Sequence, residues 1–208
     1  GHKMKLYYKP GACSLAPHIA LRMAGLDFTL EKVDTQKKTT ESGTDYLAVT
    51  PKGYVPALEI AGGEVLTEAP AVLQFIGDQK PESGLAPQPG TLERLRVQEH
   101  LNYVASELHK AYGPFFGAAP ISDDAKPAAL ANIEKKLSYF ETVLSDGRAY
   151  LTGGTFTVAD SYFFVVTNWS NFIGLDLGKW PHIAGYMGRV SALPAVQEAL
   201  KAEGLLAA

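Results

Sequence analysis

The chain contains 208 residues, of which 46% are hydrophobic and 20% are charged, an ordinary composition for a globular protein. Its formal net charge of −3 disfavours partners with dense negative charge, so we expect neither a nucleic-acid nor a membrane-surface function. No apolar run reaches the roughly 18 residues of a membrane span, and the single cysteine excludes an internal disulfide, which favours a cytoplasmic location.

Gly1-His2-Lys3 precedes Met4, and we expect the native chain to begin at Met4. Strand and helix patterns alternate from there. In chain order we predict a strand at 6–8, a helix carrying Leu15, Ile19, Met23 and Leu26 with Gly25 as its cap, a strand at 29–33, a short helix at 45–49, a hairpin of strands 57–60 and 65–66, and a helix at 70–78. Two parallel strands linked by a helix and followed by a hairpin form an α+β layer.

The Pro- and Gly-rich stretch 80–90 interrupts these patterns, and every later pattern is helical. Apolar residues recur there at three- and four-residue spacing in two stripes: Leu92, Leu95, Leu101, Val104 and Leu108, then Leu130, Ile133, Leu137, Phe140 and Leu144. Thr157-Val158-Ala159-Asp160 has the form of a capping box, and two further helices are predicted near 180–192 and 195–201. We therefore predict an α+β domain over residues 4–83, a linker at 84–90 and an all-helical domain over 91–208.

Cys13 follows a Pro10-Gly11 turn and precedes the first predicted helix. Unpaired backbone N–H groups and the positive end of the helix dipole meet at such a junction, where they stabilise a thiolate, the reactive form of cysteine. The alternative is a buried small hydrophobe, which is the usual state of a free cysteine; the turn before it favours a functional thiol. Ser14 is interpreted as the N-cap of the helix or as a second donor to a thiolate, and His18 as structural.

Two loops carry groups that suit a peptide ligand. A cis bond at Val55-Pro56 would expose the Val55 backbone to an extended peptide, and an ordinary turn proline is an equal alternative. Thr67-Glu68-Ala69-Pro70 opens a helix, whose N–H groups attract a carboxylate while Glu68 attracts an ammonium. Taken alone, Glu68 is better explained as a favourable charge in the first helical turn.

A polar face on the long helix after the linker combines amide, hydroxyl and imidazole groups. A solvated face readily explains charged residues, but this combination is less typical of one. The residues of this polar face are Asn102, Ser106, Glu107, His109 and Lys110. His109 can donate or accept a proton near neutral pH. Lys38 can meet a carboxylate, although most loop lysines are simply solvated. We predict no metal site, since the sequence holds no zinc-ligand spacing, and it holds no P-loop or dinucleotide fingerprint.

In their order along the chain, these residues resemble the bacterial beta-class glutathione S-transferases from Met4 to about Leu206. The matching segments are Met4 to Tyr8, Pro10 to Leu15, Thr50 to Pro56, Leu66 to Glu68, Leu101-Asn102, Ser106 to Lys110 and Phe156 to Asp160. Each segment is weak alone, and the ordered set is specific. The resemblance implies a thioredoxin-like N-terminal domain, an all-α C-terminal domain, a homodimer and glutathione as cosubstrate.

The resemblance also assigns roles to residues. It implies that Cys13 contacts the glutathione sulfur, that Val55, next to Pro56, pairs its backbone with the cysteinyl unit, and that Glu68 and the N–H of Ala69 hold the γ-glutamyl end. The glutathione site is completed by Lys38, Asn102, Ser106, Glu107, His109 and Lys110. Ala69 replaces a serine that is frequent in the wider superfamily, which removes one neutral hydrogen bond, worth about 1 kcal/mol.

These inferences predict a cytoplasmic detoxification enzyme in which Cys13 and His109 lower the pKa of the glutathione thiol for attack on small hydrophobic electrophiles. We place the electrophile site at Tyr112, Phe115 and Phe116. Cys13 also permits thiol–disulfide exchange or peroxide reduction, with a second glutathione resolving the mixed disulfide. The alternatives are non-catalytic sequestration of hydrophobic compounds, an interaction module, and a glutathione-dependent dehalogenase or isomerase.

Overall fold

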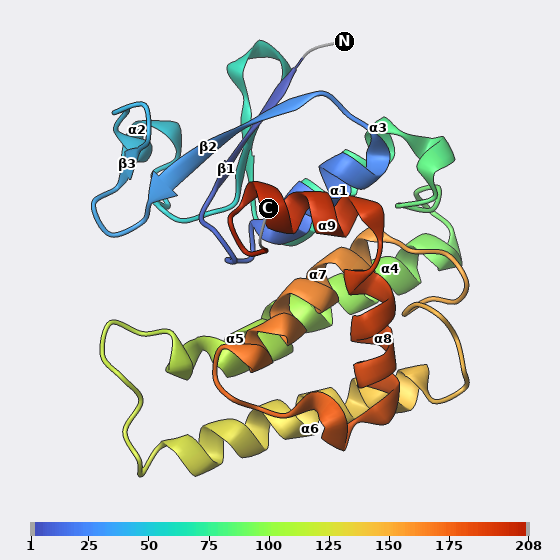
Figure 1. The fold of residues 1–208 in the computed structure, drawn as a ribbon. Coiled ribbons are helices and arrows are strands. Elements are labelled where there is room, and N and C mark those ends of the chain that lie inside the picture. The colour runs from blue at the N-terminus through green and yellow to red at the C-terminus, as the bar shows by residue number, and fades with distance from the viewer. Residues whose placement is uncertain (1–2, 207–208) are drawn as a thin grey trace.

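The computed structural model describes residues 3–206. Residues 1–2, where an added leader is expected, and residues 207–208, the end of the predicted helical domain, lie outside that range. Figure 1 shows a sheet-containing layer stacked on a layer of helices. The described strands form one mixed sheet in the order β3-β2-β1-β4-β5. Their bounds are β1 Met4–Tyr8, β2 Phe28–Asp34, β3 Thr39–Thr40, β4 Ala57–Glu59 and β5 Val65–Thr67.

β1 lies at the centre of the sheet, parallel to β2 and antiparallel to β4. Leu6 of β1 pairs with Leu30 on one side and with Leu58 on the other, and Leu6 and Leu58 are fully buried. The parallel pair followed by the antiparallel β4–β5 hairpin confirms the predicted α+β layer. The sequence did not predict β3, because two consecutive threonines are too short a run to show strand alternation.

α1, Leu15–Ala24, lies between the sheet and the helical layer, and eight of its ten residues are buried. Gly25 ends α1 in the left-handed conformation (φ 67°), as predicted, and its N–H bonds to the carbonyls of Leu21 and Arg22. Ser14 occupies the N-cap position, but its hydroxyl makes no cap bond. It accepts from the N–H of Lys9 and donates to the carbonyl of Lys9, so it closes the turn before Cys13 instead.

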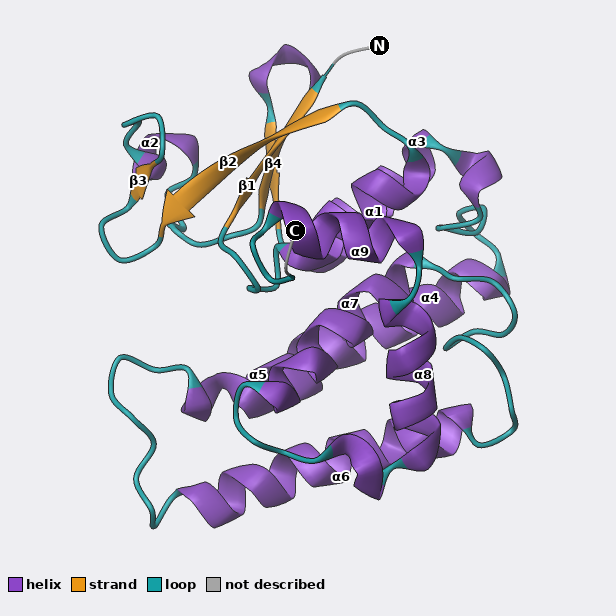
Figure 2. Cartoon of the chain, viewed as in Figure 1, coloured by secondary structure: helices purple, strands orange, loops and turns teal. Residues whose placement is uncertain are grey.

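The other helices are α2 Tyr46–Val49, α3 Ala69–Gln79, α4 Leu92–Tyr103, α5 His109–Tyr112, α6 Lys126–Leu144, α7 Val158–Asn168, α8 Pro181–Ser191 and α9 Pro194–Ala202. A π-helical turn, Val104–Leu108, joins α4 to α5, so the three segments run on as one long helix (Figure 2). α7 begins with the predicted capping box and is buried along almost its whole length, in contact with α1 and α4. Within residues 3–206, no helix combines the length and apolarity that crossing a membrane requires. The all-helical second part confirms the predicted fold class.

The two predicted apolar stripes have different outcomes. On α6, Ile133, Leu137, Phe140 and Leu144 are buried, as predicted, and Leu130 is half-buried against the same core. On α4, however, Leu92 and Leu95 are 61% and 56% exposed. The buried line of α4 runs instead through Arg94, Val97 and Leu101. The prediction is therefore wrong for the first turns of α4, because an arginine occupies the core-facing position there.

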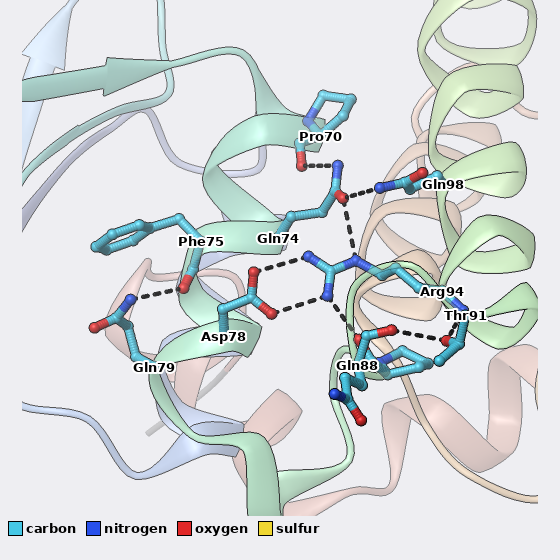
Figure 3. A network of polar contacts seen from close by, with 10 residues as sticks. Pro70, Gln74, Phe75, Asp78, Gln79, Gln88, Thr91, Arg94 and Gln98 are labelled. Carbon is cyan, nitrogen blue, oxygen red and sulfur yellow. Dashed lines mark hydrogen bonds and ion pairs between the residues drawn. The ribbon is translucent and has the colours of Figure 1, made fainter.

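Arg94, a buried residue of α4, connects this helix to α3 through a partly buried polar network (Figure 3). Its guanidinium makes two parallel bonds of 2.8 Å to the carboxylate of Asp78 and a third of 2.6 Å to the carbonyl of Pro87. Its Nε donates to Gln74 Oε1, which also accepts from Gln98. These bonds compensate the burial of a cation that is only 4% exposed.

Candidate active site at the start of α1

Cys13 lies between the turn that follows β1 and the first residue of α1, as the sequence predicts. Its side chain is partly buried, and its sulfur donates to the carbonyl of Val55, 3.4 Å away. Burial raises the pKa of the thiol to about 12, and backbone N–H groups at the start of α1 lower it by less. The prediction of an ionised thiol is therefore wrong for this structure: desolvation outweighs the helix terminus, and Cys13 carries its proton at neutral pH.

The peptide bond between Val55 and Pro56 is cis, which was one of the two interpretations of this proline. Val55 is buried beside Cys13, two residues before the first residue of β4. The segment before β4 therefore presents backbone groups next to the thiol.

Glu68 precedes α3 with a positive φ of 72°, which is uncommon for a residue with a side chain. Its carboxylate accepts from Lys52 Nζ at 3.0 Å and from the Tyr54 hydroxyl at 2.8 Å. These two partners, Lys52 first, hold the pKa of Glu68 below its usual value. Glu68 is thus a carboxylate at neutral pH, and it lies next to the N–H groups at the start of α3. Neither Lys52 nor Tyr54 was predicted as a site residue.

His109 begins α5, and its ring packs edge-on against Trp169 at 4.9 Å between centroids. Its Nδ1 lies 2.7 Å from the hydroxyl of Tyr162, a buried residue of α7. Burial lowers the pKa of His109, so the imidazole is neutral at pH 7. Burial also raises the pKa of Tyr162, so the phenol keeps its proton. The phenol can donate that proton to Nδ1, which leaves Nε2 as the nitrogen that carries hydrogen.

Two adjoining pockets meet at Cys13, Tyr54, Val55 and His109. The first, about 400 Å³, is the more polar, and its remaining lining residues are Pro56, Glu68, Ala69, Pro70, Ala105, Lys110 and Tyr162. The second, about 530 Å³, is mostly apolar and is completed by residues from both ends of the chain: Lys9, Pro10, Gly11, Ala12, Thr35, Gly113, Phe116, Trp169, Phe172 and Leu205. The site therefore combines a groove whose lining includes the charged residues Glu68 and Lys110 with a mostly apolar pocket, and Cys13 lines both.

Four of the predicted glutathione-binding residues lie outside both linings: Lys38, Asn102, Ser106 and Glu107. Lys38 donates through Nζ to the carbonyl of Gly53 at 2.7 Å. Asn102 and Ser106 are exposed, and exposed Glu107 lies 3.8 Å from Lys136. Of the predicted polar face, only His109 and Lys110 line the pockets in this structure.

The predicted electrophile site is wrong for Tyr112. That side chain is fully buried, and its hydroxyl lies 2.6 Å from the hydroxyl of Ser170, so it faces the core rather than a cleft. Phe115 packs against the core and lines neither pocket. Phe116 is half exposed, lines the apolar pocket and packs edge-on against Trp169.

The apolar wall that sequence reasoning missed consists of Trp169, Phe172 and Leu205. These residues follow α7 and α9, far along the chain from Cys13, and nothing in their spacing separates them from core residues. Within residues 3–206, no group of three or more His, Cys, Asp or Glu side chains is placed to hold a metal ion.

Two family models match the chain: the glutathione S-transferase N-terminal domain over residues 11–79 and the glutathione S-transferase C-terminal domain over residues 103–194. Glutathione S-transferase GstA of Escherichia coli O157:H7 is 46% identical, with 97% of this chain and 100% of that protein aligned. A sphingomonad glutathione S-transferase complexed with glutathione superposes with a TM-score of 0.92 at 48% identity, and a beta-class enzyme of Sphingomonas chungbukensis with 0.93 at 46%. Each superposition covers 97% of this chain and 100% of the other.

Proposed function

The chain belongs to the glutathione S-transferase family, and we propose that its two adjoining pockets hold glutathione and a hydrophobic electrophile on either side of Cys13. The beta-class resemblance predicted from the sequence is confirmed. The enzyme is a glutathione S-transferase that joins glutathione to hydrophobic electrophiles. Sequestration, dehalogenation and isomerisation are not favoured, because the relative that is 46% identical over its full length bears the transferase name.

One observation carries the placement of glutathione: a single groove is lined by Cys13, Val55, Glu68 and Ala69. Glutathione is an extended tripeptide with an ammonium and a carboxylate at its γ-glutamyl end. Glu68, ionised and at the start of α3, suits the ammonium, while the N–H of Ala69 suits the carboxylate. The backbone of Val55 suits the cysteinyl unit in the manner of an added strand. The ligand's sulfur then lies beside Cys13.

We assign Cys13 and His109 as hydrogen-bond donors to the glutathione sulfur. Each is neutral in the free protein, because burial raises the pKa of the thiol and lowers that of the imidazole. A thiolate is stabilised by donors that are already oriented in a desolvated pocket. The S–H of Cys13 and the N–H at Nε2 of His109 supply two such donors, and the glutathione thiolate attacks the electrophile.

The apolar pocket is proposed as the electrophile site, with Trp169 and Phe116 as its aromatic wall. Trp169 contacts the edges of both His109 and Phe116. A planar, apolar electrophile that packs against Trp169 and Phe116 would lie next to the glutathione sulfur, because Cys13 lines both pockets. Lys38, Asn102, Ser106 and Glu107 remain proposed contacts from the family resemblance, as part of the junction between the two domains.

We also propose that the protein forms a homodimer. The exposure of Leu92 and Leu95 on one side of α4 supports this, and light scattering after gel filtration tests it. A cytoplasmic role in detoxification is supported by the single free cysteine. We keep the domains at 4–83 and 91–208, with 84–90 as the linker.

The test is steady-state conjugation with glutathione and a chloronitroaromatic electrophile, in the wild type and in Glu68→Gln. We expect saturable turnover in the wild type. Glu68→Gln should raise the KM for glutathione about tenfold and leave kcat within about twofold, because the bond that is lost holds the ammonium and not the sulfur. Glu64→Gln, an exposed change in the β4–β5 turn, is the matched control and should behave as wild type. A wild type that binds glutathione without turnover would contradict the proposed function.

A further inference from the structure

The turn that carries Cys13 is held by the C-terminal half of the chain through both backbone groups of Gly11. The Gly11 N–H donates to Oε1 of Glu203 at 3.0 Å, and its carbonyl accepts from Nε1 of Trp169 at 2.9 Å. Glu203 directly follows α9, which lies alongside α1 (Figure 1), and Trp169 directly follows α7. Gly11 has a φ of +74°, and a Cβ there would lie 3.6 Å from Leu205. We call these two bonds the Gly11 clamp.

Glu203 is itself fixed by a buried neighbour, His18. Its other oxygen, Oε2, lies 2.6 Å from Nδ1 of His18, and both side chains are fully buried. Arg22 Nε donates to Nε2 of His18 at 2.9 Å. Because a guanidinium can only donate, Nε2 must accept, so the proton sits on Nδ1 and points at Glu203. The carboxylate therefore receives two donors from fixed directions, one from α1 and one from the Cys13 turn.

Trp169 connects the clamp to the other side of the site. Its indole N–H holds Gly11, two residues before Cys13, while its ring packs against His109. Gly11, Cys13, His109 and Trp169 all line the apolar pocket. The Gly11 clamp therefore connects the turn that carries Cys13 to Trp169, which contacts His109.

We propose that Glu203 and Trp169 are positioning residues that set the distance between the turn that carries Cys13 and the side chain of His109. The kinetic part of this inference rests on the proposed function, and the geometric part does not. Glutathione's γ-glutamyl end and cysteinyl backbone are held elsewhere, at Glu68 and Val55. Loosening the clamp should therefore disturb electrophile use far more than glutathione binding.

Glu203→Gln tests the kinetic part. The amide keeps one acceptor oxygen, so it can satisfy only one of the two donors that now meet the carboxylate. We expect kcat to fall and the KM for the electrophile to rise, together lowering kcat/KM about five- to tenfold, with the KM for glutathione within about twofold. Glu198→Gln is the matched control: Glu198 lies on α9 itself, is mostly exposed and lies 3.8 Å from Arg22, and the variant should behave as wild type.

Trp169 fluorescence tests the geometric part without glutathione. The chain has two tryptophans, so in a Trp180→Phe background the emission reports Trp169 alone. Glu203→Gln should raise the acrylamide quenching constant of Trp169 at least about twofold, because the turn that holds the indole is released, and Glu198→Gln should not. This readout stays interpretable even if the wild type shows no turnover, which would contradict the proposed function but not the clamp.

Two results would overturn the clamp. One is a Glu203→Gln protein with wild-type quenching and a wild-type KM for the electrophile. The other is a lower kcat with both KM values and the quenching unchanged, since fewer folded molecules alone produce that pattern. If Glu203→Gln does not fold, Glu203→Asp is used instead. Aspartate keeps the negative charge, but its side chain is one methylene shorter, so the carboxylate lies farther from its two donors. The same readouts and outcomes then apply.

Discussion

The thiol of Cys13 donates to the backbone carbonyl of Val55, 3.4 Å away. That carbonyl belongs to the segment that we propose pairs with the cysteinyl unit of glutathione. We therefore expect binding to exchange one donor for another: the peptide N–H takes the carbonyl, and the S–H of Cys13 is released toward the incoming sulfur. Because burial keeps the thiol protonated, we expect the released group to act as a donor rather than as a nucleophile in conjugation.

Replacing Cys13 should separate its two possible chemistries. Cys13→Ser keeps a hydrogen-bond donor and should keep conjugation within about threefold of wild type. Cys13→Ala removes the donor and should lower kcat/KM about tenfold, the usual cost of one hydrogen bond to a charged group. Both variants should lose any reduction of mixed disulfides that passes through a Cys13–glutathione disulfide. Parallel assays of conjugation and of mixed-disulfide reduction check this, and two variants that match wild type in both assays would remove Cys13 from the chemistry.

The pKa of Cys13 predicts how its reactivity depends on pH. In the free protein, the rate of alkylation by iodoacetamide should rise about tenfold per pH unit from about pH 6 to about pH 10, without a plateau, since the thiolate fraction is still climbing toward a pKa of about 12. Intact-mass measurements give the rates, and free glutathione, which levels off near its own pKa, is the reference. A plateau near neutral pH would show an activated thiolate instead.

The same shift has a consequence for stability. The folded-state pKa of about 12 lies above the ordinary value of 9.0, so folding favours the protonated thiol. The stabilisation is complete below the unfolded-state value and is lost as the pH rises toward 12. Cys13→Ser should therefore lose less stability than wild type over this alkaline range in urea titrations.

Tyr162→Phe removes the hydroxyl that lies 2.7 Å from Nδ1 of His109. Without it, the imidazole no longer has a fixed tautomer, and we expect kcat/KM to fall about fivefold while the KM for glutathione changes little. Nitrogen NMR of the His109 side chain should show the change in protonation between Nδ1 and Nε2.

Tyr112→Phe is the matched control for this change. It removes another buried hydroxyl, which pairs with Ser170 outside both pockets. It should lower stability by about 1 kcal/mol without changing the kinetics. Equal kinetic losses in the two variants would show that Tyr162 acts through stability alone.

The sequence predicted the fold wherever the local pattern and the tertiary contacts agree. The β1–α1–β2 unit, the hairpin, the end of α1 at Gly25 and the capping box of α7 all follow from turn residues and periodicity. The prediction failed on α4, where Leu92 and Leu95 continue the apolar spacing of the sequence but their side chains are exposed. An arginine at the core-facing position reverses the expected pattern, because its charge is balanced by Asp78, a partner on another helix.

The site was predictable only where the thiol and peptide-binding segments carry recognisable turns. Cys13, Val55 and Glu68 stand at such turns, and His109 stands on a mixed polar face. Lys52 and Tyr54 pair with Glu68 across a loop, and no local pattern marks such a partner. The protonation of Cys13 depends on how deeply the folded chain buries it, which is a property of packing rather than of the helix terminus beside it.

Arg94→Met tests whether the polar network in Figure 3 stabilises the contact between α3 and α4. Methionine fills part of the space but supplies no donor, so the carboxylate of Asp78, the carbonyl of Pro87 and Gln74 lose a shared partner. We expect a loss of about 2 kcal/mol in the free energy of unfolding, below the full cost of breaking a buried pair, because the Asp78 side chain is 39% exposed and can be partly solvated. Arg96→Met on the same helix breaks an exposed pair with Glu99 and should change stability by less than about 0.5 kcal/mol. Urea denaturation measures both, and equal losses would mean that α3 and α4 are held together by apolar packing rather than by Arg94.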